Sequence, residues 1–216
     1  MWSTLWRIES RGIRRDVIGV AELIGFVVLS LLIFAFVTRA VSIPAPLILW
    51  VTLLFGGVLY LGRSFDREWA SDGSRVLEGL RMIPGAIPRL FWVKWGSNSL
   101  VLLLVSLLAT GLLMLFLEEP GGWLAWSWLP LVIGLCGFSA LGTLFAAGVV
   151  MQTRREYLLA ILCYPLAIPL ILAVSQCLTN GLATGRVDPV WIKLTAGCAL
   201  LYITVASLLF PYLVEE

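Results

Sequence analysis

The chain has 216 residues, of which 60% are apolar and 13% are charged, with a formal net charge of +2 and a mean hydropathy of +0.99. Soluble domains have about half apolar and about a quarter charged residues, so this composition excludes a water-soluble fold. Histidine is absent, and without the most common general base and the most common zinc and haem ligand, a soluble enzyme and a histidine-ligated cytochrome are excluded as well.

The first expected element is an amphipathic helix over residues 1–16. Its apolar face contains Trp2, Leu5, Trp6 and Ile13, and its basic face contains Arg7, Arg11, Arg14 and Arg15. This segregation predicts a helix that lies in the membrane interface, with indole rings among the acyl chains and guanidinium groups near anionic head groups. The alternative, a basic flank that only fixes topology, accounts for the arginines but not for the tryptophans.

Six long apolar runs follow this start, and each has the about 20 residues that a membrane helix needs. They cover residues 17–38, 43–62, 96–117, 129–151, 157–178 and 194–214. Runs this continuous do not fit the alternating pattern of a barrel strand, whereas helices satisfy their own backbone hydrogen bonds in lipid. The first run exceeds the about 7–15 residues of a signal-peptide core, which favours a permanent span. We therefore expect an all-α membrane protein with six transmembrane helices, in a single domain over residues 1–216.

Lysine and arginine are distributed unevenly around these runs. Twelve of the 15 lie in residues 1–16, 63–95 and 154–155, and the other three lie in the opposite connections. Because positively charged flanks stay in the cytoplasm, this pattern predicts that both termini are cytoplasmic.

The connection at residues 63–95 is the only sizeable polar segment. We expect the second span to continue into it as a helix, because four residues are spaced for one helical face. These are Phe65, Glu68, Trp69 and Asp72.

A short helix is then expected between a turn at Asp72-Gly73-Ser74 and a turn at Pro84-Gly85. Its apolar stripe consists of Val76, Leu77, Leu80 and Ile83. Pro88 suits the first turn of the following helix. The chain has little cytoplasmic mass on which the stripe could pack, so we expect a docking surface for another protein. The alternative is a helix that lies on the lipid surface.

Pro165 and Pro169 lie four residues apart on one face of the fifth run. Each lacks a backbone N–H, which frees the carbonyl groups of Ile161 and Pro165 and bends the helix. The pair is expected either to act as a hinge or to form a static kink whose carbonyl groups bond to neighbouring helices.

Glu22 is the only charge within the six runs. It lies about one or two turns from the polar boundary, where it could reach lipid head groups or an arginine of the amphipathic helix, and we favour a structural ion pair over a role in transport. Trp123, Trp126 and Trp128 lie together in an external connection. For them an aromatic belt at the membrane boundary is favoured over a stacking surface for haem or a partner.

The four cysteines all fall inside the runs and form no C-x-x-C motif. They are Cys136, Cys163, Cys177 and Cys198. We expect small apolar packing residues, and a disulfide between the last two is the less favoured alternative. No G-x-x-x-x-G-K-[ST] motif is present, so any ATP that the protein uses is expected on a separate chain.

The residues resemble those of a known family at three places. The polar connection carries the pattern DG…LE…L…P…K, at Asp72, Gly73, Leu77, Glu78, Leu80, Pro84 and Lys94. The second run contains Leu49-Trp50-Val51. Arg154-Arg155 is followed by a paired-proline span that reads YPLAIPLI from Tyr164 to Ile171. Over the whole chain the sequence resembles the haem exporter B family, CcmB, and the acidic connection is shared with the wider class of ABC exporter permeases.

The resemblance implies a permease-like membrane subunit of an ABC-type complex in cytochrome c maturation. Two copies would form a homodimer, and two CcmA-like ATPase subunits would bind beneath it. CcmC- and CcmD-like membrane partners would present haem on a periplasmic CcmE-like chaperone, and the ATP-driven cycle would release the loaded chaperone. The resemblance singles out an ATPase-coupling region at Glu68, Asp72, Gly73, Leu77, Glu78, Leu80 and Pro84.

We therefore expect a non-enzymatic subunit of the bacterial inner membrane that binds no cofactor and no nucleic acid itself. Haem would be handled by its partners, and ATP would be bound by the partner subunit. Two alternatives are an ABC permease that exports a polysaccharide, lipid or drug, and a membrane scaffold that transports nothing.

Overall fold

The computed structural model describes residues 17–38, 43–65, 85–117, 124–149 and 155–215, and these residues form six helices and no strand. The helices are α2 (Val17–Val37), α3 (Ala45–Leu61), α5 (Ala86–Leu117), α6 (Leu124–Val149), α7 (Arg155–Thr184) and α8 (Pro189–Glu215). The predicted all-α class is confirmed for this part of the chain. The predicted interfacial helix at 1–16 lies outside the described residues.

Five of the described helices, all except α3, are long and apolar enough to cross a membrane, and they match five of the six predicted runs. Helix α3 has 17 residues and extends about 26 Å at about 1.5 Å per residue, against about 30 Å of hydrocarbon. Pro44 is its N-cap and Gly62 is its C-cap. The predicted run 43–62 is therefore shortened at both ends.

Helix α5 is longer than the predicted span, because it begins at Ala86 and has 32 residues. Pro88 lies in its first turn, as predicted. Gly85, directly before the helix, has a φ of 73°, a left-handed conformation that glycine adopts without steric cost. Helices α7 and α8 also extend beyond their predicted runs, and the Asp188 carboxylate caps α8 by accepting a hydrogen bond from the backbone N–H of Val190 at 2.9 Å.

The predicted continuation of the second span through Phe65 is wrong. Helix α3 ends at Leu61, and the chain forms tight turns in which the N–H groups of Arg63 and Ser64 donate to carbonyl groups three residues earlier. Phe65 is only 1% exposed, because its ring packs into the bundle instead of extending away from it. Glu68, Trp69 and Asp72 lie outside the described residues.

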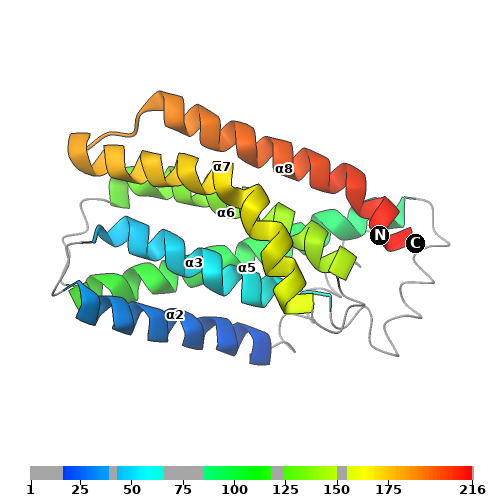
Figure 1. Ribbon diagram of the computed structural model, residues 1–216, viewed down its shortest axis with the longest axis horizontal. Coiled ribbons are helices and arrows are strands. Elements are labelled where there is room, and N and C mark those ends of the chain that lie inside the picture. The colour runs from blue at the N-terminus through cyan, green and yellow to red at the C-terminus, as the bar shows by residue number, and fades with distance from the viewer. Residues whose placement is uncertain (1–16, 39–42, 66–84, 118–123, 150–154, 216) are drawn as a thin grey trace.

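Helix α6 occupies the centre of the bundle (Figure 1) and packs against α3, α5, α7 and α8. Helix α2 lies at one edge, against α3 and α5, and α8 lies at the opposite edge. Of the five membrane-length helices, α6 is the most buried and α2 the least.

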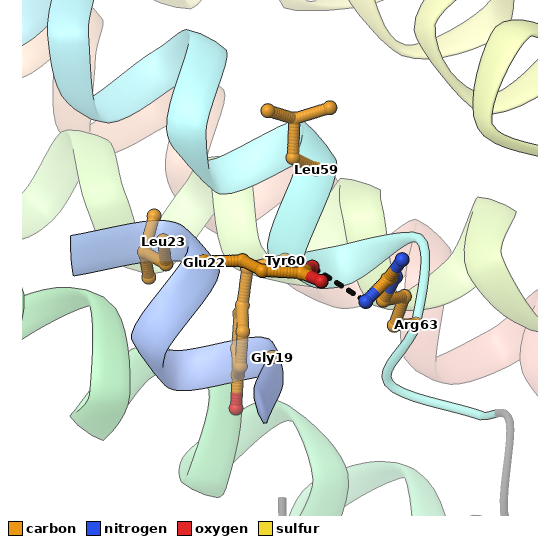
Figure 2. Close-up of a pocket in the computed structure, with 6 residues that line it drawn as sticks. All are labelled: Gly19, Glu22, Leu23, Leu59, Tyr60 and Arg63. Atoms are coloured by element: carbon orange, nitrogen blue, oxygen red, sulfur yellow. Dashed lines mark hydrogen bonds and ion pairs between the residues drawn. The ribbon is translucent and has the colours of Figure 1, made fainter. Parts of the chain in front are cut away.

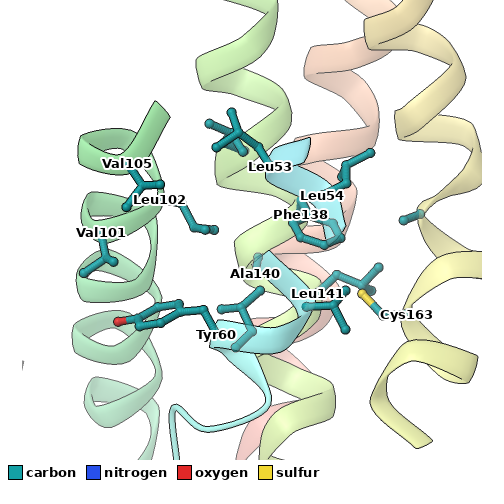
Figure 3. Packing of buried hydrophobic residues seen from close by; sticks show 14 of the residues in the cluster. Leu53, Leu54, Tyr60, Val101, Leu102, Val105, Phe138, Ala140, Leu141 and Cys163 are labelled. Atoms are coloured by element: carbon teal, nitrogen blue, oxygen red, sulfur yellow. The ribbon is translucent and has the colours of Figure 1, made fainter. Parts of the chain in front are cut away.

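The core takes buried residues from all six described helices. Figure 3 shows the part of it in which Phe138 of α6 lies beside Leu54 of α3, with Leu102 of α5 nearby. Glycine residues on α6 allow close approach of the neighbouring helices. A Cβ atom on Gly137 would lie 2.8 Å from the Cα atom of Ala199 in α8, and Gly142 leaves room for Leu61 of α3. Small residues at such positions let neighbouring helices pack closely.

Candidate functional site

An aromatic cluster joins three separate parts of the chain at one end of the bundle. We call it the junction and define it as Ser64, Phe65, Phe91, Lys94 and Phe210. The Phe65 ring lies 5.8 Å from that of Phe210, and the Phe91 ring lies 5.4 Å from that of Phe210. Phe65, Phe91 and Phe210 are all buried. The turn after α3, the start of α5 and the end of α8 are therefore packed as one unit.

Lys94 places a charged amine inside this junction. The residue is 4% exposed, its Nζ donates a hydrogen bond to the carbonyl oxygen of Ser64 at 2.6 Å, and the same Nζ lies 5.2 Å from the centre of the Phe65 ring. A buried charge is costly unless polar and aromatic groups compensate it, and a cation–π contact contributes about 0.5–2 kcal/mol. Lys94 thus fixes the turn from which the 66–84 segment continues.

Polar side chains within about one turn after Lys94 connect α5 to the central helix, α6. The Trp95 indole N–H donates to the carbonyl oxygen of Cys136 at 2.9 Å, and the Asn98 amide donates to the Thr143 hydroxyl at 3.0 Å. Ser99 donates to Ser139 at 3.1 Å. Buried polar groups that satisfy one another rigidify a helix pair, so this end of α5 is fixed to α6.

An ion pair lies between α2 and the end of α3, where Arg63 Nη1 and Glu22 Oε2 are 2.5 Å apart. The two residues line a pocket of about 80 Å³ (Figure 2). The expected structural ion pair of Glu22 is present, but its partner is Arg63, because the turn after α3 brings that residue alongside α2. The arginines of residues 1–16 lie outside the described residues.

The predicted coupling residues lie outside the part of the chain that the structure describes. They are Glu68, Asp72, Gly73, Leu77, Glu78, Leu80 and Pro84. The same holds for the residues of the predicted interfacial helix, namely Trp2, Leu5, Trp6, Arg7, Arg11, Arg14 and Arg15.

Pro165 and Pro169 are both exposed on the outer face of α7, and the helix continues through both of them. Figure 1 shows α7 bending along its length. The Tyr202 hydroxyl of α8 donates to the carbonyl oxygen of Leu166 at 2.5 Å. A hydrogen bond from a neighbouring helix therefore supports the backbone between the two prolines.

Of the three tryptophans in the predicted external connection, Trp126 has a close packing contact. The indole of Trp126, at the start of α6, lies directly over Gly181 of α7 and leaves no room for a Cβ atom there. Trp128 is partly buried, and Trp123 lies outside the described residues.

All four cysteines are free thiols, so the alternative of a disulfide between Cys177 and Cys198 is wrong. Among the described residues, no group of histidine, cysteine, aspartate and glutamate side chains could hold a metal ion.

Sequence reasoning missed most of the junction. Lys94 was noted only as a position of the family motif, and Arg63 only as one of the positive charges in the 63–95 connection. Both residues lie next to an end of a predicted span, so both were already expected at the same membrane boundary. Phe91 and Phe210 carried no signal, since an aromatic residue in an apolar helix is ordinarily a lipid or core contact.

The chain matches a known protein family over nearly its whole length. The family described as CcmB protein matches residues 5–215 and so includes the sequence of the 66–84 segment. A comparison with curated proteins finds no match. Since the family match covers essentially the whole chain, the chain belongs to the CcmB family, the haem exporter membrane subunits of the cytochrome c maturation ABC system.

Proposed function

We propose that this chain couples ATP hydrolysis on a partner ATPase to the release of a haem-loaded periplasmic chaperone in cytochrome c maturation. The observation that supports the proposal most strongly is the junction, where Lys94 and Phe210 hold the base of the 66–84 segment against two helices of the membrane body. Because Ser64 and Phe65 are held there, we expect a displacement of the residues that follow them to be transmitted to the bundle.

All six helices would cross the membrane, in one permease domain over residues 1–216 with both termini in the cytoplasm. Helix α3 is short, but most of its residues are buried among its neighbours. Its ends therefore need not reach the lipid boundary on their own, and a bilayer adapts to a short span at modest cost. In this topology the junction and the Glu22–Arg63 pair lie on the cytoplasmic side.

The ATPase would dock on the 66–84 segment, in the region of Glu68, Asp72, Gly73, Leu77, Glu78, Leu80 and Pro84. Its displacement would pass through Phe65 to Phe210 of α8, and from Phe210 to Phe91 of α5. Because α5 is fixed to α6 by the contacts of Trp95, Asn98 and Ser99, this pair would move as a rigid body. Helix α7 would bend at Pro165 and Pro169 to accommodate the change, as a two-state transition.

The partners proposed for the chain follow from its family. A CcmA-like subunit would bind ATP, and CcmC-, CcmD- and CcmE-like proteins would handle haem, so the chain itself would bind no cofactor. A second copy of the chain would complete the permease, and exposed apolar residues on α7 and α8 provide surface for such a contact. The helix at residues 1–16 would lie in the membrane interface.

Docking is tested by replacing Leu77 and Leu80 with Asp in the assembled complex. We expect the ATPase to be lost on purification while the membrane body keeps its helical content, because charges on the apolar stripe oppose burial in an interface. Leu182→Asp is the matched control, since Leu182 is an exposed leucine near the opposite end of the bundle. Retention of the ATPase by the Leu77→Asp, Leu80→Asp chain would place the docking surface elsewhere.

A further inference from the structure

The pocket between α2 and α3 combines an acid, a base and an apolar wall. It is lined by Gly19, Glu22, Leu23, Leu59, Tyr60 and Arg63. The Glu22 and Arg63 side chains are 54% and 35% exposed, so a molecule in the surrounding medium can reach both. The proposed coupling mechanism gives this pocket no role.

In the proposed topology, the pocket lies at the depth of the membrane where phospholipid head groups are found. The apolar stretch of α2 begins at Gly19 and α3 ends at Leu61, so Glu22 and Arg63 lie near the ends of two apolar helices. Beyond this depth, the hydrocarbon extends for about 30 Å. A ligand that reaches the pocket from the membrane therefore has its polar end here and its apolar end further into the bilayer.

An apolar stripe leads from the pocket along α3. Leu59, Phe55 and Val51 are spaced four residues apart, so they share one face of the helix. Their exposed fractions are 45%, 52% and 36%. An acyl chain that starts at the pocket can lie along this stripe.

The two charges select the head group. The Arg63 guanidinium has several N–H donors and binds a phosphate well, and a carboxylate accepts hydrogen bonds from an ammonium group. A guanidinium carries five N–H donors and a carboxylate carries two acceptor oxygens, so each group is able to serve more than one partner at a time. A head group with a phosphate alone would meet the negative charge of Glu22, and a trimethylated ammonium has no N–H to donate.

We propose that this pocket binds the head group of an aminophospholipid such as phosphatidylethanolamine. The phosphate contacts Arg63, the ammonium contacts Glu22, and one acyl chain lies along Leu59, Phe55 and Val51. The proposal rests on the proposed topology, in which α2 and α3 both cross the membrane with these ends at its boundary, and it is independent of the coupling function.

The experiment titrates delipidated protein in detergent with dioleoyl phosphatidylethanolamine, phosphatidylglycerol or phosphatidylcholine, and counts bound lipid by native mass spectrometry. The wild-type chain is expected to bind phosphatidylethanolamine about tenfold more tightly than the other two, since hydrogen bonds to charged groups are worth this much or more. Equal binding of the three lipids, or preference for phosphatidylglycerol, overturns the proposal.

Two variants separate the roles of the charges. Arg63→Gln is expected to weaken binding of all three lipids, because each carries a phosphate, and Glu22→Gln is expected to lose the preference for phosphatidylethanolamine. Lys193→Gln and Asp188→Asn make the same charge changes near the start of α8 and are expected to keep the wild-type affinity and preference. If Arg63→Gln keeps the wild-type affinity or Glu22→Gln keeps the preference, the pocket does not bind the head group as proposed. Arg63→Lys keeps the charge and is expected to retain part of the binding, which guards against a folding defect in Arg63→Gln.

Discussion

Lys94 is a buried charge that makes two contacts with the turn after α3. Its amine donates to the Ser64 carbonyl oxygen and lies over the Phe65 ring, so the interactions that compensate its burial also hold that turn in place. Replacing a buried charge by an apolar side chain of similar volume is often neutral for global stability. The role of Lys94 should therefore appear as a local effect.

We predict that Lys94→Met accelerates hydrogen exchange of the backbone amides at Arg63 and Ser64 about tenfold. The charged hydrogen bond that is removed is worth about 1.5–3 kcal/mol, and its loss raises the population of the open turn accordingly. Exchange is measured by mass spectrometry on peptides that cover residues 60–66. Lys94→Arg keeps a donor and should change exchange less, and Lys193→Met, at an exposed position of α8, should leave it unchanged. Unaltered exchange in Lys94→Met would mean that Lys94 does not anchor the turn.

The helices of the bundle are held together by close contacts that involve α6. Because Gly137 has no side chain, α8 lies so close to α6 that a Cβ atom on Gly137 would be 2.8 Å from the Cα atom of Ala199. Because the obstacle is backbone, it cannot move aside as a flexible side chain would. A Cβ atom on Gly197 of α8 would meet nothing within 4 Å, so these two glycines differ in surroundings but share a helical conformation.

Gly137→Ala is predicted to destabilise the detergent-solubilised protein by about 1–3 kcal/mol, the usual cost of overpacking. Gly197→Ala is predicted to be neutral or to stabilise by up to about 1 kcal/mol, since alanine is the better helix former. Both values follow from unfolding monitored by circular dichroism. Equal stability of the two variants would show that α6 and α8 are not in such close contact at Gly137.

For the whole molecule, the sequence predicts those structural features that depend on the local pattern of residues. The apolar runs located five membrane-length helices, and Pro88 correctly located the first turn of α5. Their ends were less well predicted, because a helix such as α5 continues past its apolar run wherever neighbouring chain covers it. Helix α3 is shorter than its run, since Pro44 and Gly62 cap it.

The junction could not be predicted because its members lie far apart in the chain and have ordinary local surroundings. Phe65 has helical spacing to Glu68 and Trp69, which predicted a continued helix, but burial against Phe210 of α8 outweighs that preference. Local propensity is a weak guide wherever tertiary contacts are this extensive. The partner of Glu22 was missed for the same reason, as Arg63 lies 41 residues away.

The central claim is that movement of the 66–84 segment reaches the membrane body through Phe210. It is tested most directly by ATP-dependent release of the haem-loaded chaperone from the purified complex. Phe210→Leu keeps apolar volume but removes two ring contacts, each worth about 0.5–1.5 kcal/mol. We predict that this complex retains its ATPase and hydrolyses ATP but releases the chaperone about three- to tenfold more slowly. Phe138→Leu, an equally buried change outside the junction, should release it at the wild-type rate. Wild-type release by Phe210→Leu would contradict the account.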